Sequence, residues 1–141
     1  MSENANVHAT CVALSDRAVL IQGQSGQGKS ALGLQLLAYG CVLVADDQVQ
    51  ISRRDHDLVA SPPHTIVGLI EARGVGILNA IHQQEAKVVL VIDLDQTETE
   101  RLPQRRSITL LGCELPLIYR IEAAHFAPAV LQILKAGWSD R

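Results

Sequence analysis

The chain has 141 residues, of which 48% are hydrophobic and 3% aromatic, and its formal net charge is −3. This length and composition suit one compact domain and exclude a disordered tail. The acidic balance and the scarcity of aromatic residues argue against a nucleic-acid binder, and no apolar run reaches the ~20 residues of a membrane span. The first residues lack signal-peptide features. We therefore expect a single soluble domain over residues 1–141, with no nucleic-acid or membrane partner.

The hydrophobic pattern predicts strands at 7–14 and 18–22, joined by a turn at 15–17. The later elements are predicted as a helix at 31–39, strands at 41–45, 49–52, 58–61, 88–92, 108–111 and 115–121, and a helix at 129–136. Most of these pairings are local, which favours a mixed sheet over a purely parallel one.

Three cysteines, Cys11, Cys41 and Cys113, lie singly in apolar surroundings without metal-binding spacing. We expect them to be buried free thiols of a protein in the reducing cytoplasm.

Residues 23–30 match the phosphate-loop pattern G-x-x-x-x-G-K-S, between a predicted strand and a predicted helix. The glycines allow backbone N–H groups to turn toward phosphate oxygens, and the helix N-terminus adds a partial positive charge. Lys29 has the reach for the β- and γ-phosphates, and the Ser30 hydroxyl suits a magnesium shell. The motif predicts that a nucleoside triphosphate is bound by Gly23, Gln24, Ser25, Gly26, Gln27, Gly28, Lys29 and Ser30.

Two groups of carboxylates follow predicted strands and are candidates for the acid that a phosphate-loop enzyme needs. Asp46 and Asp47 follow the strand at 41–45, and their mutual repulsion suits one of them to proton transfer. Asp93 and Asp95 follow the strand at 88–92, where a generic phosphate-loop ATPase carries its magnesium acid. Both groups also fit ordinary turns at strand ends, and the Asp93 group is typical of entry into a loop.

Three stretches resemble the HPr kinase/phosphorylases, bacterial enzymes that phosphorylate a serine of the phosphocarrier HPr. They are Gly-Gln-Ser-Gly-Gln-Gly-Lys-Ser at 23–30, Leu-Val-Ala-Asp-Asp-Gln-Val at 43–49 and Ile-Glu-Ala-Arg-Gly-Val-Gly-Ile-Leu at 70–78. The third is similar to that family's own signature, and all three occur in family order and spacing. The resemblance implies an α/β phosphate-loop kinase fold related to phosphoenolpyruvate carboxykinase, with a mixed sheet and flanking helices. It also implies a cytoplasmic protein-serine kinase that uses ATP and Mg²⁺ and acts on HPr or an HPr-like carrier.

The resemblance assigns roles to individual residues. Asp47 matches the proton acceptor of the kinase reaction and the proton donor of its reverse, and His8 and Lys29 match further active-site residues. Ser30 and Glu71 match the two magnesium ligands.

Arginines complete the set that the resemblance implies. Arg73 lies in the signature loop, and Arg101 is similar to a late catalytic arginine that stabilises the transferred phosphoryl group. Arg105 and Arg106 compete with Arg101 for that role.

The chain also departs from the usual family pattern. The N-terminal domain of the usual family is expected to be absent, because the chain resembles a shortened form found in some proteobacteria. The chain also lacks a Pro-Gly-Arg-Asn-type segment linked to dephosphorylation, so that reaction stays open. Arg120 is expected to be a strand residue or a stand-in for that segment.

The family forms hexamers, so a homo-oligomer is expected, and residues 130–134 of the last helix either face a neighbour or cover the sheet. Two alternatives remain, a nucleotide-binding regulator without catalysis and a small-molecule kinase that uses Asp93 as its magnesium acid.

Overall fold

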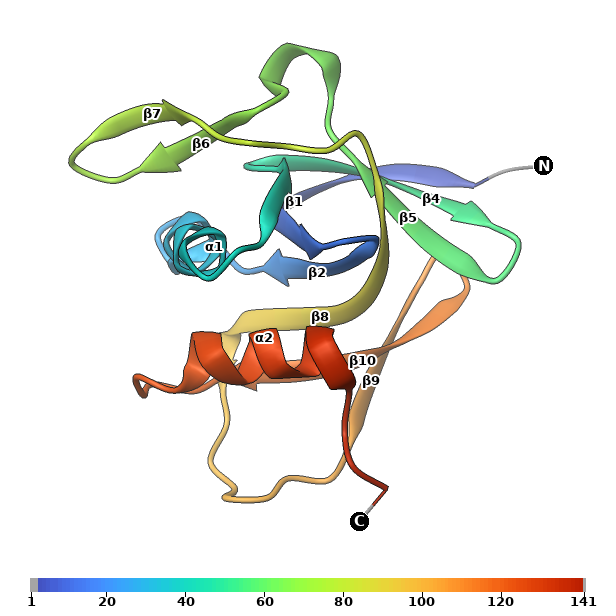
Figure 1. Ribbon diagram of the computed structural model, residues 1–141. Coiled ribbons are helices and arrows are strands. Elements are labelled where there is room, and N and C mark those ends of the chain that lie inside the picture. The colour runs from blue at the N-terminus through green and yellow to red at the C-terminus, as the bar shows by residue number, and fades with distance from the viewer. Residues whose placement is uncertain (1–2, 141) are drawn as a thin grey trace.

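The computed structural model describes residues 3–140 (Figure 1). The strands are β1 Asn4–Leu14, β2 Arg17–Gln22, β3 Val42–Ala45, β4 Gln48–Arg54, β5 Asp57–Ser61, β6 Leu69–Ala72, β7 Gly76–Asn79, β8 Ala86–Thr97, β9 Arg106–Leu110 and β10 Cys113–Arg120. The helices are α1 Lys29–Ala38 and α2 Phe126–Ala136, with a short 3-10 turn, η1, at His64–Ile66. No helix within residues 3–140 has the length and apolar character to cross a membrane.

Eight strands form one mixed sheet, which confirms the expected fold class. Its order is β2-β1-β4-β5-β8-β10-β9, with β3 also paired to β1. A further pairing of β2 with β8 closes β1, β2, β8, β5 and β4 into a ring. Strands β2 and β10 both run parallel to β8, whereas the other pairs are antiparallel. The carboxyl ends of β2, β8 and β10 therefore meet at one edge of the sheet, and the phosphate loop follows β2 there.

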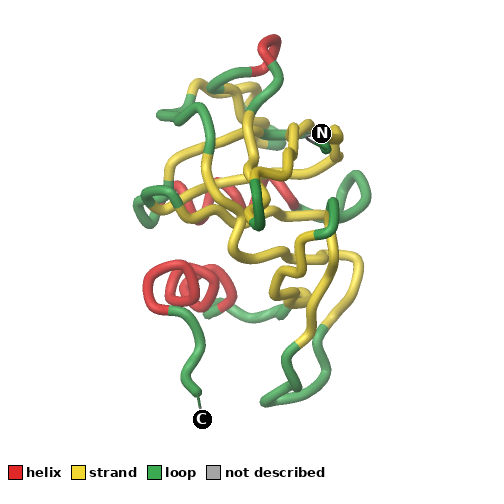
Figure 2. The backbone as a smooth tube through the Cα atoms, turned by 90° about the vertical axis from the view of Figure 1, so that its right-hand side faces the viewer, coloured by secondary structure: helices red, strands yellow, loops and turns green. Residues whose placement is uncertain are grey.

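Alternation along the strands divides the buried side chains into two cores. Leu20 on β2 belongs to a cluster drawn from sheet strands, whereas its neighbour Val19 belongs to a cluster shared with both helices. Figure 2 shows α2 lying along one side of the strands. Val130 and Leu134 of α2 are 0% and 1% exposed in the second cluster, so these residues cover the sheet. Cys11, Cys41 and Cys113 are buried free thiols, as predicted.

The structure corrects three expectations about local elements. The segment around Arg73, expected as a loop, is a separate two-stranded hairpin of β6 and β7, which projects at the upper left of Figure 1. Asp93 and Asp95 lie inside β8, which continues to Thr97 because β2 and β10 pair with its second half. Helix α2 begins at Phe126, three residues before the predicted start.

Candidate active site

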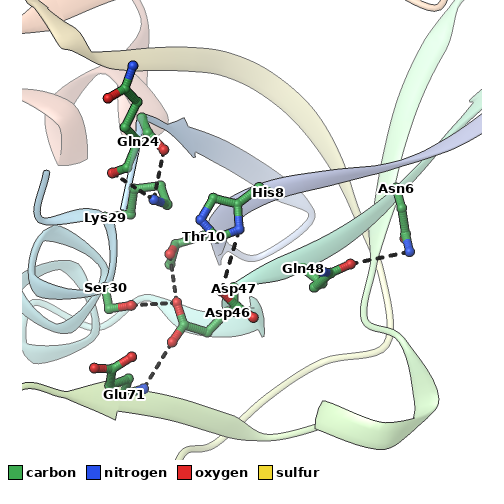
Figure 3. A network of polar contacts seen from close by, with 11 residues as sticks. Asn6, His8, Thr10, Gln24, Lys29, Ser30, Asp46, Asp47, Gln48 and Glu71 are labelled. Carbon is green, nitrogen blue, oxygen red and sulfur yellow. Dashed lines mark hydrogen bonds and ion pairs between the residues drawn. The ribbon is translucent and has the colours of Figure 1, made fainter. Parts of the chain in front are cut away.

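A cavity of about 540 Å³ opens where the phosphate loop, β1, the turn between β3 and β4, and the β6–β7 hairpin meet. Its lining residues are His8, Ser25, Gly26, Gly28, Lys29, Ser30, Ala31, Leu34, Asp47, Glu71, Ala72, Arg73 and Val75. Nine of the predicted site residues thus come together from four separate parts of the chain. Figure 3 shows the polar contacts around this cavity.

The phosphate loop leaves β2 at Gly23 and enters α1 at Lys29. Gly26 and Gly28 have φ angles of 87° and 94°, which L side chains rarely adopt, so these positions require glycine. Lys29 is only 7% exposed, and its Nζ donates to the carbonyls of Gly23 at 2.8 Å and Gln24 at 3.2 Å. The ammonium group is thus held at the loop, beside an α1 N-terminus that carries no side-chain cap. Such an N-terminus is suited to bind an anion.

Asp46 connects the phosphate loop to two other elements of the site. Its side chain is 5% exposed, and its Oδ1 accepts hydrogen bonds from Thr10 at 2.6 Å and Ser30 at 2.7 Å. Its Oδ2 accepts the backbone N–H of Glu71 at 2.9 Å. These three donors belong to β1, α1 and β6, so one buried carboxylate joins three walls of the cavity (Figure 3). The sequence had given Asp46 together with Asp47 as a candidate acid, and it did not predict this bridging role.

Asp47 faces the cavity although it adjoins the buried Asp46. Its φ of 69° lies in the left-handed region, which aspartate tolerates better than most residues, and this turns the chain between β3 and β4. The side chain is 70% exposed, and its Oδ1 lies 3.5 Å from Nδ1 of His8 on β1. The structure therefore gives Asp47 the accessible carboxylate and gives His8 a position beside it.

The β6–β7 hairpin brings a carboxylate and a guanidinium to the same cavity. Glu71 and Arg73 are exposed and both belong to its lining. The Glu71 backbone is fixed by Asp46, while its own carboxylate stays accessible across the cavity from Ser30.

The late arginines lie outside the cavity lining. Arg101 is exposed in the segment after β8. Arg105 lies 4.5 Å from the centre of the Trp138 ring and donates to the Ser139 carbonyl at 3.0 Å. The structure thus places Arg101 apart from the residues around Asp47, and its catalytic role stays a prediction.

Arg106 forms an ion pair with Glu98 at 3.0 Å and lies 4.3 Å from the centre of the Tyr119 ring. Burial acts to raise the pKa of Glu98, but N–H groups of Glu100 and Thr99, together with Arg106, outweigh it and hold this pKa below its usual value. These contacts connect Arg106, the first residue of β9, to Glu98 just after β8 and to Tyr119 on β10, which is a structural role.

Two residues near the carboxyl ends of β8 and β10, Asp95 and Arg120, contact the phosphate loop in a way that the sequence did not predict. Asp95 accepts the N–H of Gln24 at 3.0 Å, and Arg120 contacts the carbonyl of Gln27. Asp93 accepts the N–H of Asp95 at 2.9 Å and is not part of the cavity lining. The signal that would have predicted these contacts is the position of Asp95 and Arg120 near the ends of the parallel strands β8 and β10.

The donor set around the cavity fits a nucleotide with magnesium. Nothing lies within 4 Å of a Cβ built at Gly26 or Gly28, so this face of the loop is open to phosphate. Ser30 and Glu71 offer the oxygen ligands that Mg²⁺ prefers. No group of three or more His, Cys, Asp or Glu side chains among residues 3–140 is placed to hold a metal ion by itself. One or two protein oxygens, completed by phosphates and water, are the usual arrangement for Mg²⁺.

A phosphate loop on a mixed sheet, with carboxylates on the adjacent turn, gives this chain the architecture of the phosphate-loop kinase fold. Residues 1–119 match the family model of the HPr Serine kinase C-terminal domain, and the chain belongs to this family.

Curated relatives agree with this membership. The HPr kinase/phosphorylase of Geobacillus kaustophilus is 37% identical over 123 residues, which are 78% of this chain and 40% of that protein. The HPr kinase/phosphorylase of Streptococcus mutans is 34% identical over 131 residues, which are 84% of this chain and 42% of that protein. The chain therefore spans about two fifths of the length of these relatives.

A solved structure has the same fold over nearly the whole chain. The Hpr(Ser) kinase/phosphatase from Coxiella burnetii superposes with a TM-score of 0.73 at 27% sequence identity and covers 93% of both chains. The kinase fold expected from the sequence is thus confirmed.

Proposed function

We propose that this chain is an ATP-dependent protein-serine kinase that phosphorylates HPr or an HPr-like carrier. The observation that carries the proposal is the exposed Asp47 carboxylate, which lines the same cavity as Lys29 and Ser30 of the phosphate loop. The names of the curated relatives, HPr kinase/phosphorylase, agree with this substrate.

The phosphate loop is proposed to bind the triphosphate of ATP through the residues 23–30. Backbone N–H groups and the α1 N-terminus contact the phosphate oxygens, and Lys29 adds a full positive charge. Ser30 and Glu71 would hold Mg²⁺, which when bound neutralises charge on the phosphates. Arg73 lines the same cavity and can stabilise charge on the transferred group.

Asp47 is proposed to accept the proton of the substrate serine. The step forms a bond between the serine Oγ and the γ-phosphorus and breaks the bond from this phosphorus to the oxygen that bridges it to ADP. The serine proton passes to the Asp47 carboxylate, and ADP leaves with the electron pair of the broken bond. His8, 3.5 Å from this carboxylate, orients it toward the cavity. In the reverse reaction Asp47 would return the proton.

The deciding experiment is incubation of the protein with γ-labelled ATP, Mg²⁺ and purified HPr. We expect label on an HPr serine with the wild type, and none with Asp47→Asn at unchanged ATP affinity. Asp93→Asn is the matched control, since the Asp93 carboxylate accepts a hydrogen bond from the Asp95 N–H within β8 and does not line the cavity. Unlabelled HPr at full ATP binding would favour one of the two alternatives, a nucleotide-binding regulator or a small-molecule kinase. An inactive Asp93→Asn beside an active Asp47→Asn would overturn the role proposed for Asp47.

Dephosphorylation is tested with the same components. β10 runs from Cys113 to Arg120 and is followed by α2 at Phe126, which leaves five residues between them. Incubation of serine-phosphorylated HPr with inorganic phosphate measures whether so short a connection supports the reverse reaction.

The proposal extends to assembly and location. We expect a homo-oligomer in solution, a hexamer as in the HPr kinase/phosphorylases. Sedimentation measures this oligomeric state. Three buried free thiols are consistent with the cytoplasm, where thiols stay reduced.

A further inference from the structure

We propose that Arg120 is a positioning residue that sets the direction of a phosphate-binding N–H group in the loop. This inference rests on the proposed nucleotide binding by residues 23–30. Arg120 is the last residue of β10 and lies next to the loop because β10 and β2 flank β8 in parallel.

The Arg120 guanidinium bridges two segments of backbone. Its Nε donates to the Leu94 carbonyl at 3.1 Å, and its Nη2 donates to the Gln27 carbonyl and, at 3.3 Å, to the Gln27 Oε1. The arginine backbone is fixed as well, since its own carbonyl accepts the N–H of Glu98 at 2.9 Å. The guanidinium is thus held at its base by β8 and reaches the tip of the phosphate loop.

The contact fixes one peptide plane of the loop. All peptide bonds of the described chain are trans, so the Gln27 carbonyl and the Gly28 N–H point in opposite directions within one rigid plane. Gly28 lines the cavity and Gln27 does not. Because Arg120 draws the carbonyl away from the cavity, the Gly28 N–H is directed toward the side where phosphate oxygens bind.

The peptide between Gln27 and Gly28 needs such an anchor because the other contacts of the loop tip do not hold the Gln27 carbonyl. Gly26 and Gly28 have open space around them, and residues 24–28 are all exposed. Besides the contact with Arg120, the Gln27 N–H donates to the Gln24 carbonyl at 3.2 Å, and Gln24 bonds Asp95 and Lys29. The Gly28 carbonyl accepts the N–H of Leu32 at 3.0 Å. None of these bonds reaches the Gln27 carbonyl. A glycine-rich segment has many accessible conformations, and each of them that turns the Gly28 N–H away weakens phosphate binding.

Arginine is suited to this task and lysine is not. The planar guanidinium offers separate donors to Leu94 and Gln27 at once, whereas an ammonium group is a single point charge on a flexible stem.

The test compares Arg120→Gln and Arg120→Lys with a matched control, Arg53→Gln. Arg53 also joins two backbone segments, through the carbonyls of Asp55 at 3.0 Å and Leu111 at 3.3 Å, and it does not line the cavity. Calorimetric titration with Mg²⁺-ADP should show a Kd raised about tenfold or more in both Arg120 variants, the size expected for lost hydrogen bonds to a charged group. The Kd of Arg53→Gln should stay within about twofold of the wild-type Kd, even if the Tm of this variant falls as much as the Tm of the Arg120 variants.

A second readout needs no nucleotide. The amide resonance of Gly28 should move in ligand-free Arg120→Gln and stay in place in Arg53→Gln. Wild-type Kd in both Arg120 variants, or an unmoved Gly28 resonance, would overturn the proposal. If Arg120→Gln does not fold, Arg120→Lys decides alone. A wild-type chain that binds no nucleotide would instead overturn the proposed function, and the resonance would still test the anchor.

Discussion

Replacement of Asp46 by asparagine removes one acceptor from the most heavily bonded carboxylate of the site. The amide has nearly the shape of the carboxylate but carries one acceptor oxygen and one NH₂ donor. Its oxygen can keep the hydroxyl donors Thr10 and Ser30, which share one carboxylate oxygen at 2.6 and 2.7 Å. The NH₂ group then faces the Glu71 N–H, which loses its 2.9 Å bond.

The size of the effect follows from three terms. A hydrogen bond to a charged group contributes about 1.5–3 kcal/mol, and a donor left facing another donor adds a desolvation cost of about 1–3 kcal/mol. Removal of a buried charge offsets part of this loss. We expect the free energy of unfolding to fall by about 2 kcal/mol, which for a domain of this size lowers Tm by about 4–8 °C. Nucleotide affinity should fall too, since Ser30 loses its charged partner.

Asp47→Asn is the matched control, because the same chemical change occurs one residue further along. Asp47 is 70% exposed and has its ion-pair contact with His8 at 3.5 Å, so its free energy of unfolding should change by less than about 0.5 kcal/mol. Scanning calorimetry and a phosphoryl-transfer assay separate the two variants. Equal Tm values for Asp46→Asn and Asp47→Asn would refute the role assigned to Asp46.

Three further changes test other parts of the structure. Gly33→Ala should lower the free energy of unfolding by about 1 kcal/mol in urea titrations, because the new Cβ would lie 2.9 Å from Cγ2 of buried Thr10. The cost of this close contact outweighs the gain in helix propensity. A stabilised variant would contradict the prediction. Glu98→Gln should lower the urea midpoint at pH 7 and much less at pH 3. The lowered pKa of Glu98 gives the fold stability above about pH 4.3, and this stability is lost at lower pH as Glu98 protonates and its ion pair with Arg106 ends. An equal loss at both pH values argues against the pair. Cys11 should resist iodoacetamide at pH 8 until urea unfolds the chain, since burial raises the pKa of its thiol. Rapid labelling of the native protein would show that the buried cluster around Leu20, to which Cys11 belongs, is open to solvent.

The phosphate loop was predictable because its chemistry is local. Glycines that allow left-handed φ, followed by Lys29 and Ser30 at the start of a helix, define the loop in eight consecutive residues. The strands at 18–22 and 88–92 were predictable for a similar reason, since continuous apolar runs mark buried strands. The β6–β7 hairpin escaped prediction because residues 76–79 are all exposed, which removes the alternation that identifies a strand.

The different positions of the adjacent residues Asp46 and Asp47 depend on tertiary structure. The left-handed φ of Asp47 sends one carboxylate into the cavity and leaves Asp46 buried, and a sequence does not reveal which of two neighbours takes which place. The contacts of Asp95 and Arg120 with the loop likewise follow from parallel pairing of strands far apart in the chain. Such pairings override local propensity, as the continuation of β8 to Thr97 demonstrates.

Closure of the ring between β2 and β8 also determines where the large sheet is open to another strand. An unpaired sheet edge is a template on which a further strand can add, in aggregation or in recognition. Because β2 pairs with both β1 and β8, it presents no such edge. Within the described chain, β3 and β9 each pair with one strand, and the outer side of β3 is partly covered, because Leu43 exchanges backbone hydrogen bonds with Ile81 and Gln83. Strand β9 has five residues, with Ser107 and Thr109 exposed, and short polar edges resist addition. The same pairing that brings the end of β8 to the phosphate loop thereby removes β2 from the strands that another strand can extend.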